Sequence, residues 1–521
     1  MAGAGVCRAG TSSQFTHMNA RRLFTFPGGI ALAANKSAIR DRPSRRLPLP
    51  DRLVLPLRQH VGVAACPVVR VGVRVTRGEL IADTPGYVGM RLHAPTSGTI
   101  TAIGEFPVIH PSGLPAPAIV LTPDGLDETA AAAGVPADPA VVSAAGIFER
   151  IAAAGIVGLG GAGFPAHVKV QEGATQTVDT LIVNAVECEP YICCDERVAR
   201  EAADEIVGGA ALLARAVNAR ECVIAVEDDM PEARACLAQA AGEAIAVVSV
   251  PAIYPAGGEK QLITVLTGKE VPSGLLPIHV GVAVLNVQTV RAIYHAVTAG
   301  EPLIERMVTV AGDIADAGNF RVLIGTPVRH VLEHAGALPL GRRSLVSGGP
   351  MMGTRVADIE APVTKTVNCL LVRDETPVTA APLPCIRCGD CITVCPVGLN
   401  PQQLFESART ADFDTAQDYH LFDCIDCGCC AYVCPSRIPL VQHYRHAKSA
   451  IEALDRDRVD ADEARANYLA RSRRLATRDV VSTERVVALA DLDELDDERI
   501  KRELDAVLSR TRSKREPDNE A

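Results

Sequence analysis

Two stretches of the sequence repeat one cysteine pattern, and together they decide the fold of the region that holds them. They read Cys385-Ile-Arg-Cys388-Gly-Asp-Cys391-Ile-Thr-Val-Cys395-Pro396 and Cys424-Ile-Asp-Cys427-Gly-Cys429-Cys430-Ala-Tyr-Val-Cys434-Pro435, and we call them the first and second cysteine runs. Three thiolates spaced in this way can face one cubane iron–sulfur cluster, while the fourth ligand must come from elsewhere. The repeat therefore predicts a domain with two [4Fe-4S] clusters, which we place at residues 376–446.

The ligand sets follow from how such runs interlock. In two-cluster ferredoxins the fourth cysteine of each run binds the cluster of the other run. This predicts a first cluster site made of Cys385, Cys388, Cys391 and Cys434, and a second cluster site made of Cys424, Cys427, Cys430 and Cys395. Zinc is the alternative, but it needs two cysteine pairs per site and gives no reason for a repeated Cys-Pro ending. Cys429 is left as a spectator thiol, and the helical pattern over 401–410 indicates a ferredoxin domain of the larger, helical type.

Composition bounds the rest of the chain. At about 150 residues per domain, 521 residues predict three to four domains. The net charge of −10 and the absence of Trp argue against nucleic acid as a main partner. Nine of the 17 cysteines lie between Cys385 and Cys434, which favours metal binding in a reducing compartment over a disulfide framework. No uninterrupted apolar stretch reaches 18 residues, so no membrane span is expected.

The chain begins with a stretch that has no apolar core of a signal peptide, and we expect residues 1–23 to be a disordered extension, with Met18 as an alternative start. Residues 24–125 are rich in Pro, Gly and Val, with strand-like runs at 68–71 and 98–103. They resemble the barrel-sandwich module of lipoyl and biotinyl carrier domains. The chain has no lysine between Lys36 and Lys169, so a covalent cofactor arm is excluded and a docking module is expected.

Beyond this module, helical and strand-like stretches alternate over residues 126–304, which predicts a Rossmann-like α/β domain with a parallel sheet. We expect strands at 180–185, 222–226 and 246–250, and helices at 147–155, 198–217 and 231–242. Residues 305–375 predict a β-rich unit in which strands at 308–310 and 345–347 flank a helix at 328–335. Residues 447–521 are highly charged, and we expect a helical tail that becomes disordered after about Arg510.

Three phrases within the α/β domain predict a nucleotide pocket. The first is a glycine-rich loop, Gly158-Leu159-Gly160-Gly161-Ala162-Gly163-Phe164-Pro165, whose backbone can approach a phosphate closely. Its spacing is not that of the Rossmann fingerprint. The others are Asn184-Ala-Val-Glu187-Cys-Glu189-Pro190, directly after a predicted strand, and Tyr254-Pro-Ala-Gly257-Gly258-Glu259-Lys260. Each alone is also typical of an ordinary surface turn, but together they indicate one site.

In this order, and followed by the cysteine runs, these phrases resemble the FMN- and NADH-binding subunit of respiratory complex I. They resemble still more closely the C subunit of the Rnf (Rsx) ion-translocating electron transport complexes. That second resemblance extends to Phe26-Pro27-Gly28-Gly29-Ile30 and to Arg45-Arg46-Leu47-Pro48-Leu49-Pro50, and it covers residues 24–446. It implies that the β-rich unit at residues 305–375 is a β-grasp-like, soluble-ligand-binding domain.

The resemblance implies a set of residues that bind FMN and NAD(H). Phe164 matches the aromatic residue that stacks on the nicotinamide, and Glu187 and Glu189 match acids near the flavin and the NADH ribose. The full set is Gly158, Gly160, Gly161, Gly163, Phe164, Lys169, Asn184, Glu187, Glu189, Gly257, Gly258 and Glu259. Leu159 departs from the pattern, because complex I has an arginine there, and Ala166-His167 depart from most Rnf sequences.

The resemblance further implies an NADH-oxidising subunit of an ion-translocating oxidoreductase of the NADH:ferredoxin type, bound peripherally to the cytoplasmic side of the inner membrane. Its partners would be the other subunits of the complex, with ferredoxin as redox partner. Two alternatives stay open: a soluble NADH-linked flavin subunit of a hydrogenase or formate dehydrogenase, and an electron relay without a nucleotide site. The basic cluster Arg40, Arg42, Arg45 and Arg46 would contact anionic lipid or form an ordinary exposed loop.

Overall fold

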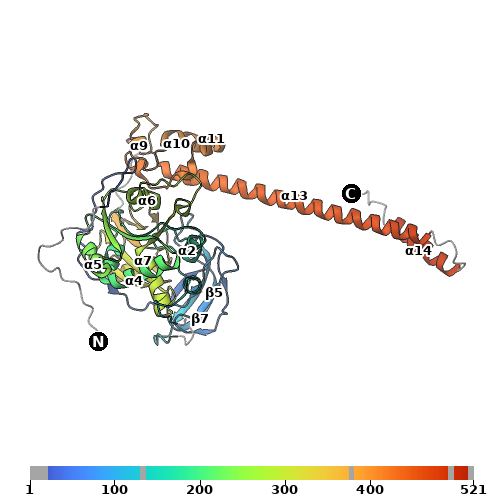
Figure 1. Ribbon diagram of the computed structural model, residues 1–521, viewed down its shortest axis with the longest axis horizontal. Helices are drawn as coiled ribbons and strands as arrows, with labels where there is room; N and C mark the ends of the chain where they lie inside the picture. Colours follow the sequence, from blue (N-terminus) through green and yellow to red (C-terminus); the bar gives the residue numbers. More distant parts are fainter. Residues whose placement is uncertain (1–20, 130–135, 375–380, 491–497, 514–521) are drawn as a thin grey trace. The chain divides into compact units, whose positions relative to one another are not determined.

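The computed structural model describes residues 21–129, 136–374, 381–490 and 498–513. The chain forms two compact units that divide between Ala447 and Lys448. The first unit contains the sheets and the cysteine runs, and the second is helical (Figure 1). Of the extension predicted at residues 1–23, residues 1–20 lie outside the described residues, whereas Arg21 donates hydrogen bonds to Leu266 O and Glu221.

The β module consists of two small antiparallel sheets. One has the order β2(Leu53–Pro56)-β8(Ala116–Pro123)-β7(Gly98–Phe106)-β4(Arg74–Val75), and the other is β3(Cys66–Pro67)-β5(Leu80–Asp83)-β6(Leu92–His93). The expected strand at 98–103 is confirmed as part of β7. The expected strand at 68–71 is wrong: Val68 and Val71 are more than half exposed, and Gly72 turns the chain with a φ of 88°. Only Val69 of this run packs against the core, and it is partly buried.

The α/β domain is built on a parallel sheet, as predicted, with the order β11(Ala246–Val250)-β10(Glu221–Glu227)-β9(Thr180–Ala185)-β12(Val282–Asn286). Alternate residues along β9 face opposite sides. Leu181 and Val183 pack in the cluster with α4(Ala203–Ala216), α5(Pro231–Ala241) and α7(Val287–Thr298), whereas Ile182 packs with α6(Glu259–Thr267). Helices therefore cover both faces, which is why the strands are apolar throughout.

The helix predicted over 198–217 is wrong as a single element. It is divided at Ala202, whose φ of −139° and ψ of 37° are not helical, into α3(Cys194–Glu201) and α4. The break lets α3 pack mainly on α5 while α4 packs mainly on α7. The helix predicted at 147–155 is α1(Ala144–Ala153), capped by Ser143, and α2(Ala166–Thr175) follows the glycine-rich loop.

A six-stranded mixed sheet follows, with α8(Val328–His334) packed on it. Its order is β1(Arg45–Arg46)-β14(Gly318–Leu323)-β13(Glu305–Gly312)-β17(Cys369–Asp374)-β15(Arg343–Ser347)-β16(Thr354–Arg355). β1 lies before β2 in the chain, and its pairing with β14 adds it to this sheet and not to the two sheets of the β module. We call residues 24–46 the strap.

The arginines of the strap form ion pairs within the protein. Arg40 pairs with both Glu196 and Asp229 at 3.0 Å. The remaining pairs are Arg42 with Asp316, Arg45 with Asp316, and Arg46 with Glu305. These ion pairs fasten the strap to the α/β domain and the six-stranded sheet, while the side chains of Arg42, Arg45 and Arg46 remain more than 40% exposed. The contact with anionic lipid stays a prediction.

The cysteine region is helical, with α9(Asp390–Thr393), α10(Pro401–Arg409), α11(Phe413–Asp418), α12(Cys429–Tyr432) and the first residues of α13(Leu440–Ala490). The helix expected at 401–410 is confirmed as α10, which starts at the cap Asn400 and has Pro401 in its first turn. The tail is helical in α13 and α14(Glu498–Ser513), so helix continues past Arg510, and residues 514–521 lie outside the described part. No helix in the described ranges has the length and apolar character needed to cross a membrane.

Candidate functional site

The three phrases singled out in the α/β domain meet in the structure. Asn184 lies at the carboxyl end of β9, and its side-chain Nδ2 donates a hydrogen bond to Gly257 O at 2.9 Å. The amide of Gly257 in turn donates to Cys188 Sγ at 3.3 Å. Lys169 of α2, just after the glycine-rich loop, forms an ion pair with Glu259 at the start of α6. The predicted pocket residues thus gather at the carboxyl edge of a parallel sheet, where α/β domains bind their ligands.

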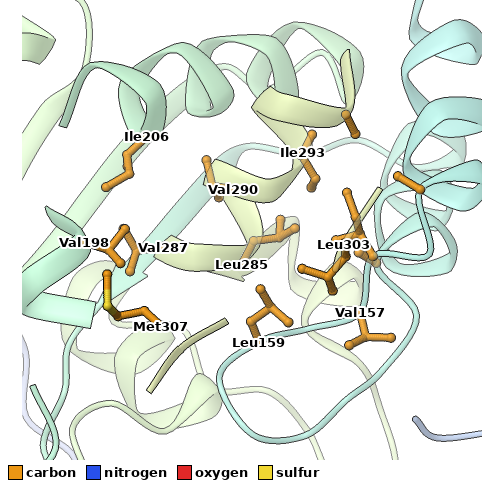
Figure 2. Packing of buried hydrophobic residues seen from close by; sticks show 14 of the residues in the cluster. Val157, Leu159, Val198, Ile206, Leu285, Val287, Val290, Ile293, Leu303 and Met307 are labelled. Carbon is orange, nitrogen blue, oxygen red and sulfur yellow. The ribbon is translucent and has the colours of Figure 1, made fainter. Parts of the chain in front are cut away.

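The glycine-rich loop is hydrogen-bonded to the protein core at Leu159 and exposed to solvent at Gly160 and Gly161. Leu159 N donates to Thr289 Oγ1 at 2.9 Å, and Leu159 O accepts from Arg306 Nη2 at 3.1 Å. Figure 2 shows the Leu159 side chain in the same packed cluster as Leu285 and Val287. The buried Leu159 side chain anchors the loop in the core.

The exposed side of the loop fits a flat ligand that approaches the backbone. Gly160 and Gly161 are exposed, and a Cβ on Gly161 would meet no atom within 4 Å. Gly161 has a φ of 109°, which only glycine adopts readily. Such a surface offers unobstructed amide donors to a phosphate or a flavin ring. These features match what FMN requires.

The amino end of α7 adds residues that the sequence interpretation missed. Asn286 caps this helix by accepting from Gln288 N at 2.9 Å, and a Cβ on Gly160 would lie 3.4 Å from Asn286 Cβ. The positive end of a 12-residue helix therefore lies directly beside the glycine-rich loop, which favours a bound phosphate. The signal was present in the sequence, because Asn286 ends the apolar run of β12 and is a typical helix cap.

Glu187 is turned toward protein rather than toward open space. Its two carboxylate oxygens accept from Asp195 N at 3.0 Å and Glu196 N at 3.1 Å, which caps α3. Lys36 of the strap donates to the Glu187 carbonyl. Burial, with the nearby Asp195 carboxylate, raises the pKa of Glu187 to about 8. In this structure the buried Glu187 carboxylate stabilises the start of α3.

Glu189 holds a loop of the six-stranded sheet against the pocket. Its carboxylate accepts from Met351 N at 3.2 Å and Met352 N at 2.9 Å. A Cβ on Gly349 would lie 2.2 Å from Glu189 Oε2, so this approach requires glycine. Burial raises the pKa of Glu189 to about 7. The other predicted residues, Gly158, Gly163, Phe164 and Gly258, lie within the same two turns, with Phe164 half-buried.

The second cysteine set surrounds one apolar cavity. Cys395, Cys424, Cys427 and Cys430 line it together with the side chains of Leu404, Val441 and Tyr444. Cys429 also lines this cavity and is fully buried. The backbone around the cavity is joined to the α/β domain, because Tyr254 Oη donates to Cys427 O at 2.6 Å and Gln261 Nε2 donates to Pro396 O at 3.3 Å.

The first cysteine set surrounds a separate cavity with a different exposure. Cys385, Cys388, Cys391 and Cys434 line it. Cys385 and Cys388 are exposed, and the intervening Ile386 keeps 68% of its surface accessible. All described cysteines are free thiols, so each cavity has four donors of the kind that a cubane cluster needs. The assignment of individual ligands stays a prediction.

Four family profiles match consecutive parts of the chain. They are the RnfC barrel sandwich hybrid domain at residues 24–126, the Nuo51 FMN-binding domain at 151–295, the SLBB domain at 307–355 and the 4Fe-4S dicluster domain at 384–438. Together with the open glycine-rich loop and the two four-thiol cavities, they support FMN and 4Fe-4S clusters as cofactors of this chain.

Curated relatives match across most of the sequence. The C subunit of an ion-translocating oxidoreductase complex from Pseudomonas aeruginosa is 46% identical over 87% of this chain and 59% of its own length. Namesakes from Yersinia pseudotuberculosis and Yersinia pestis are both 42% identical over 95% of this chain, and over 71% and 80% of their own lengths. The chain thus spans about three fifths of the Pseudomonas relative.

Among solved structures, a chain of an NAD+-reducing [NiFe]-hydrogenase in the H2-reduced state aligns with a TM-score of 0.44. It is 20% identical and covers 61% of this chain and 64% of that chain. At this TM-score the likeness carries no argument about this protein.

Proposed function

Because this chain belongs to the family of C subunits of ion-translocating oxidoreductase complexes, we propose that it is the electron-input subunit of such a complex. It oxidises NADH at its flavin pocket and delivers electrons through two [4Fe-4S] clusters to partner subunits. FMN supplies the chemistry that converts a two-electron donor into single electrons, which clusters accept one at a time. The family membership and the FMN-binding profile support the redox role, and the choice of NADH is our proposal.

The observation that carries this proposal is that the nucleotide pocket and the second cluster site share one turn. Gly257 and Glu259 of this turn contact Asn184 and Lys169 in the pocket. Tyr254, three residues before Gly257, donates its hydroxyl to Cys427 O. One turn therefore serves both sites, and this short path suits electron transfer from the flavin to the second cluster.

The order in which electrons pass through the two clusters follows from the solvent exposure of the two cluster sites. The second cluster site is buried against the α/β domain, whereas the first has two exposed cysteines. We therefore place the second cluster next to the flavin and the first cluster at the outlet toward partner proteins. Burial excludes water around the inner cluster, and exposure of the outer one shortens the distance to a docked acceptor.

The residues of the pocket have roles consistent with this function. The glycine-rich loop and the amino end of α7 would hold the phosphate of FMN, and Phe164 would stack on the nicotinamide. Lys169 and Glu259 form an ion pair that links α2 to α6, and we place both side chains at the edge of the site. Glu189 would set the position of the adjacent loop at Met351 and Met352.

The partners and location belong to the same proposal. The names of the relatives describe an ion-translocating complex, so we expect other subunits of that complex to bind this chain at a membrane. We propose a peripheral position on the cytoplasmic side of the inner membrane, with ferredoxin as the redox partner of the complex.

The test is NADH-dependent reduction of an artificial dye by the reconstituted protein, measured with and without added FMN. We expect activity that requires FMN and flavin that remains bound through gel filtration. An absence of both flavin retention and NADH oxidation, in protein that holds its clusters, would instead favour the electron relay without a nucleotide site.

A further inference from the structure

The strap carries a motif, Phe26-Pro27-Gly28-Gly29-Ile30, that neither the pocket nor the cysteine runs explain. In the structure it lies away from the β module that follows it in sequence. Phe24 N donates to Val265 O of α6 at 2.9 Å, and Ala34 O accepts from Tyr191 N at 2.8 Å. Between these two anchors the strap crosses the surface where the α/β domain meets the cysteine region.

The two glycines bring the strap backbone into contact with the backbone beside Cys395. Gly29 N donates to Val394 O at 3.1 Å. A Cβ on Gly28 would stand 2.5 Å from Val394 C and 2.7 Å from Cys395 C, and backbone atoms at that distance cannot give way as a flexible side chain can. Gly28 also has a φ of 63°, which adds conformational strain for any other residue. Glycine is therefore required here by contact and by conformation.

The next residue connects the strap to the other cysteine run. Ile30 and Tyr254 exchange two backbone hydrogen bonds, at 2.8 and 3.0 Å, as a short antiparallel bridge. Tyr254 in turn donates its hydroxyl to Cys427 O at 2.6 Å and is 2% exposed. The strap thus touches the turn that carries Cys395 directly, and it reaches the turn that carries Cys427 through one residue.

This arrangement matters because Cys395 and Cys427 come from different runs. A cubane cluster bound by both needs the two turns at a fixed separation. The short helices α9 and α12 of the two runs pack on each other, and the strap adds a further link between the turns from outside the runs. The strap also adds apolar cover, since Ile30 and Leu32 pack with Tyr254, Cys427, Cys429 and Val394.

We propose that the Phe26–Ile30 motif of the strap is a positioning element of the second cluster site, which fixes the Cys395 turn relative to the Cys427 turn and shields that cluster alone. The inference rests on the proposed function in one respect, the assignment of a cluster to this cysteine set. It does not depend on NADH oxidation.

The experiment compares Gly28→Ala with Gly113→Ala in the full chain with reconstituted clusters. Gly113 is the matched control, because its φ of 66° is nearly the same and a Cβ there would meet no atom within 4 Å. Both variants carry the strain of alanine at positive φ, and only Gly28→Ala adds the clash with Val394 and Cys395. The readouts are the electron paramagnetic resonance (EPR) spectrum of dithionite-reduced protein and the rate at which a chelator removes iron from each cluster.

For Gly28→Ala we expect an altered or lost signal from the second cluster, or loss of its iron about tenfold faster. The first cluster should keep its signal, and Gly113→Ala should change neither. An unchanged second cluster in Gly28→Ala would overturn the proposal, and so would equal loss of both clusters. Because dithionite replaces NADH as the reductant, this test does not require NADH oxidation. If Gly28→Ala disturbs only the second cluster but the wild-type protein does not oxidise NADH, the proposed function is wrong and this inference holds.

A second variant decides the matter if Gly28→Ala does not fold. Ile30→Ala keeps the backbone bonds to Tyr254 but removes apolar cover, and Leu114→Ala, at a residue 67% exposed, is its control. We expect iron to leave the second cluster about threefold faster in Ile30→Ala, with the first cluster unaffected. Equal rates in Ile30→Ala and Leu114→Ala would overturn the proposal.

Discussion

The two cysteine runs have the same spacing, but the structure gives their two cluster sites different surroundings. In the second site, Cys395, Cys427 and Cys430 are each less than 10% exposed, and the site lies beneath the strap, Tyr254 and Met351. In the first site, Cys385 and Cys388 are exposed. The asymmetry arises from what packs on each site, not from the cysteines themselves. Two copies of one motif can therefore serve as an inner and an outer electron centre.

The largest expected effect comes from replacing the predicted fourth cysteine ligand of each cluster with alanine. Cys395→Ala should remove the second cluster and Cys434→Ala the first, which in each case lowers the iron content from roughly eight to roughly four atoms. Cys429→Ala should leave both clusters, since we assign no iron to that thiol. Iron analysis and EPR of the reduced protein measure this. If Cys395→Ala instead removed the signal of the first site, each run would bind its own cluster and the interlocked sets would be wrong.

A smaller effect is expected from the link between Tyr254 and the second site. Tyr254→Phe removes the donor to Cys427 O in a buried setting, which should cost about 1–3 kcal/mol of stability. Tyr432→Phe, at a side chain 63% exposed, should change stability by less than about 0.5 kcal/mol. Anaerobic denaturant titration, followed by the visible absorbance of the clusters, measures both. Equal midpoints for the two variants would show that Tyr254 does not support the site.

Sequence reasoning predicted the parts that depend on local pattern. The spacing of the cysteine runs predicted the four-thiol sets that line the two cavities, and alternation predicted the parallel sheet. The three pocket phrases, far apart in sequence, meet because each lies at or near the same edge of that sheet.

What sequence reasoning missed depends on contacts between distant segments. We expected residues 24–125 to form one β module, and nothing in the sequence indicated that β1 within this range pairs with β14 of the six-stranded sheet. The roles of Arg306 and Thr289 beneath Leu159 have no local signature, since each reaches the loop from another element. The sequence also did not predict that the two cluster sites differ in exposure, because the two cysteine runs have the same spacing.

The pH dependence should also separate the two sites. Burial raises the pKa of Glu189 from 4.5 to about 7 in the folded protein. Between about pH 4.5 and 7 the unfolded chain releases this proton while the folded chain keeps it, so this contribution to stability falls as pH rises and is lost above about pH 7. Glu189 holds Met351, whose carbonyl oxygen would lie 2.9 Å from a Cβ on Gly428 in the second run, so the effect should fall on the second site.

Glu189→Gln should remove this component of the pH profile, with a change of up to about 2–3 kcal/mol across the window. Glu232→Gln, on the exposed side of α5, is the control and should keep the wild-type profile. Denaturant midpoints measured across that pH range compare the three proteins. A Glu189→Gln profile parallel to that of the wild type would contradict the assigned role of Glu189.

The smallest expected effect is a difference in chelator access within the unmodified protein. The first cluster should lose iron faster than the second, on the order of a few-fold, because Cys385 and Cys388 are exposed. EPR spectra recorded during the reaction distinguish the two clusters once the ligand variants have assigned their signals. Loss of the second cluster first would mean that burial in the structure does not describe access in solution.

The claim that electrons enter at the second cluster site is tested most directly by mixing NADH with variants that keep one cluster each. Cys388→Ala should retain only the second cluster and Cys427→Ala only the first. Rapid freezing followed by EPR then reports whether NADH reduces the remaining cluster within one turnover. We predict fast reduction of the cluster in Cys388→Ala and none on that timescale in Cys427→Ala. Equally fast reduction of the first cluster in Cys427→Ala would contradict the account.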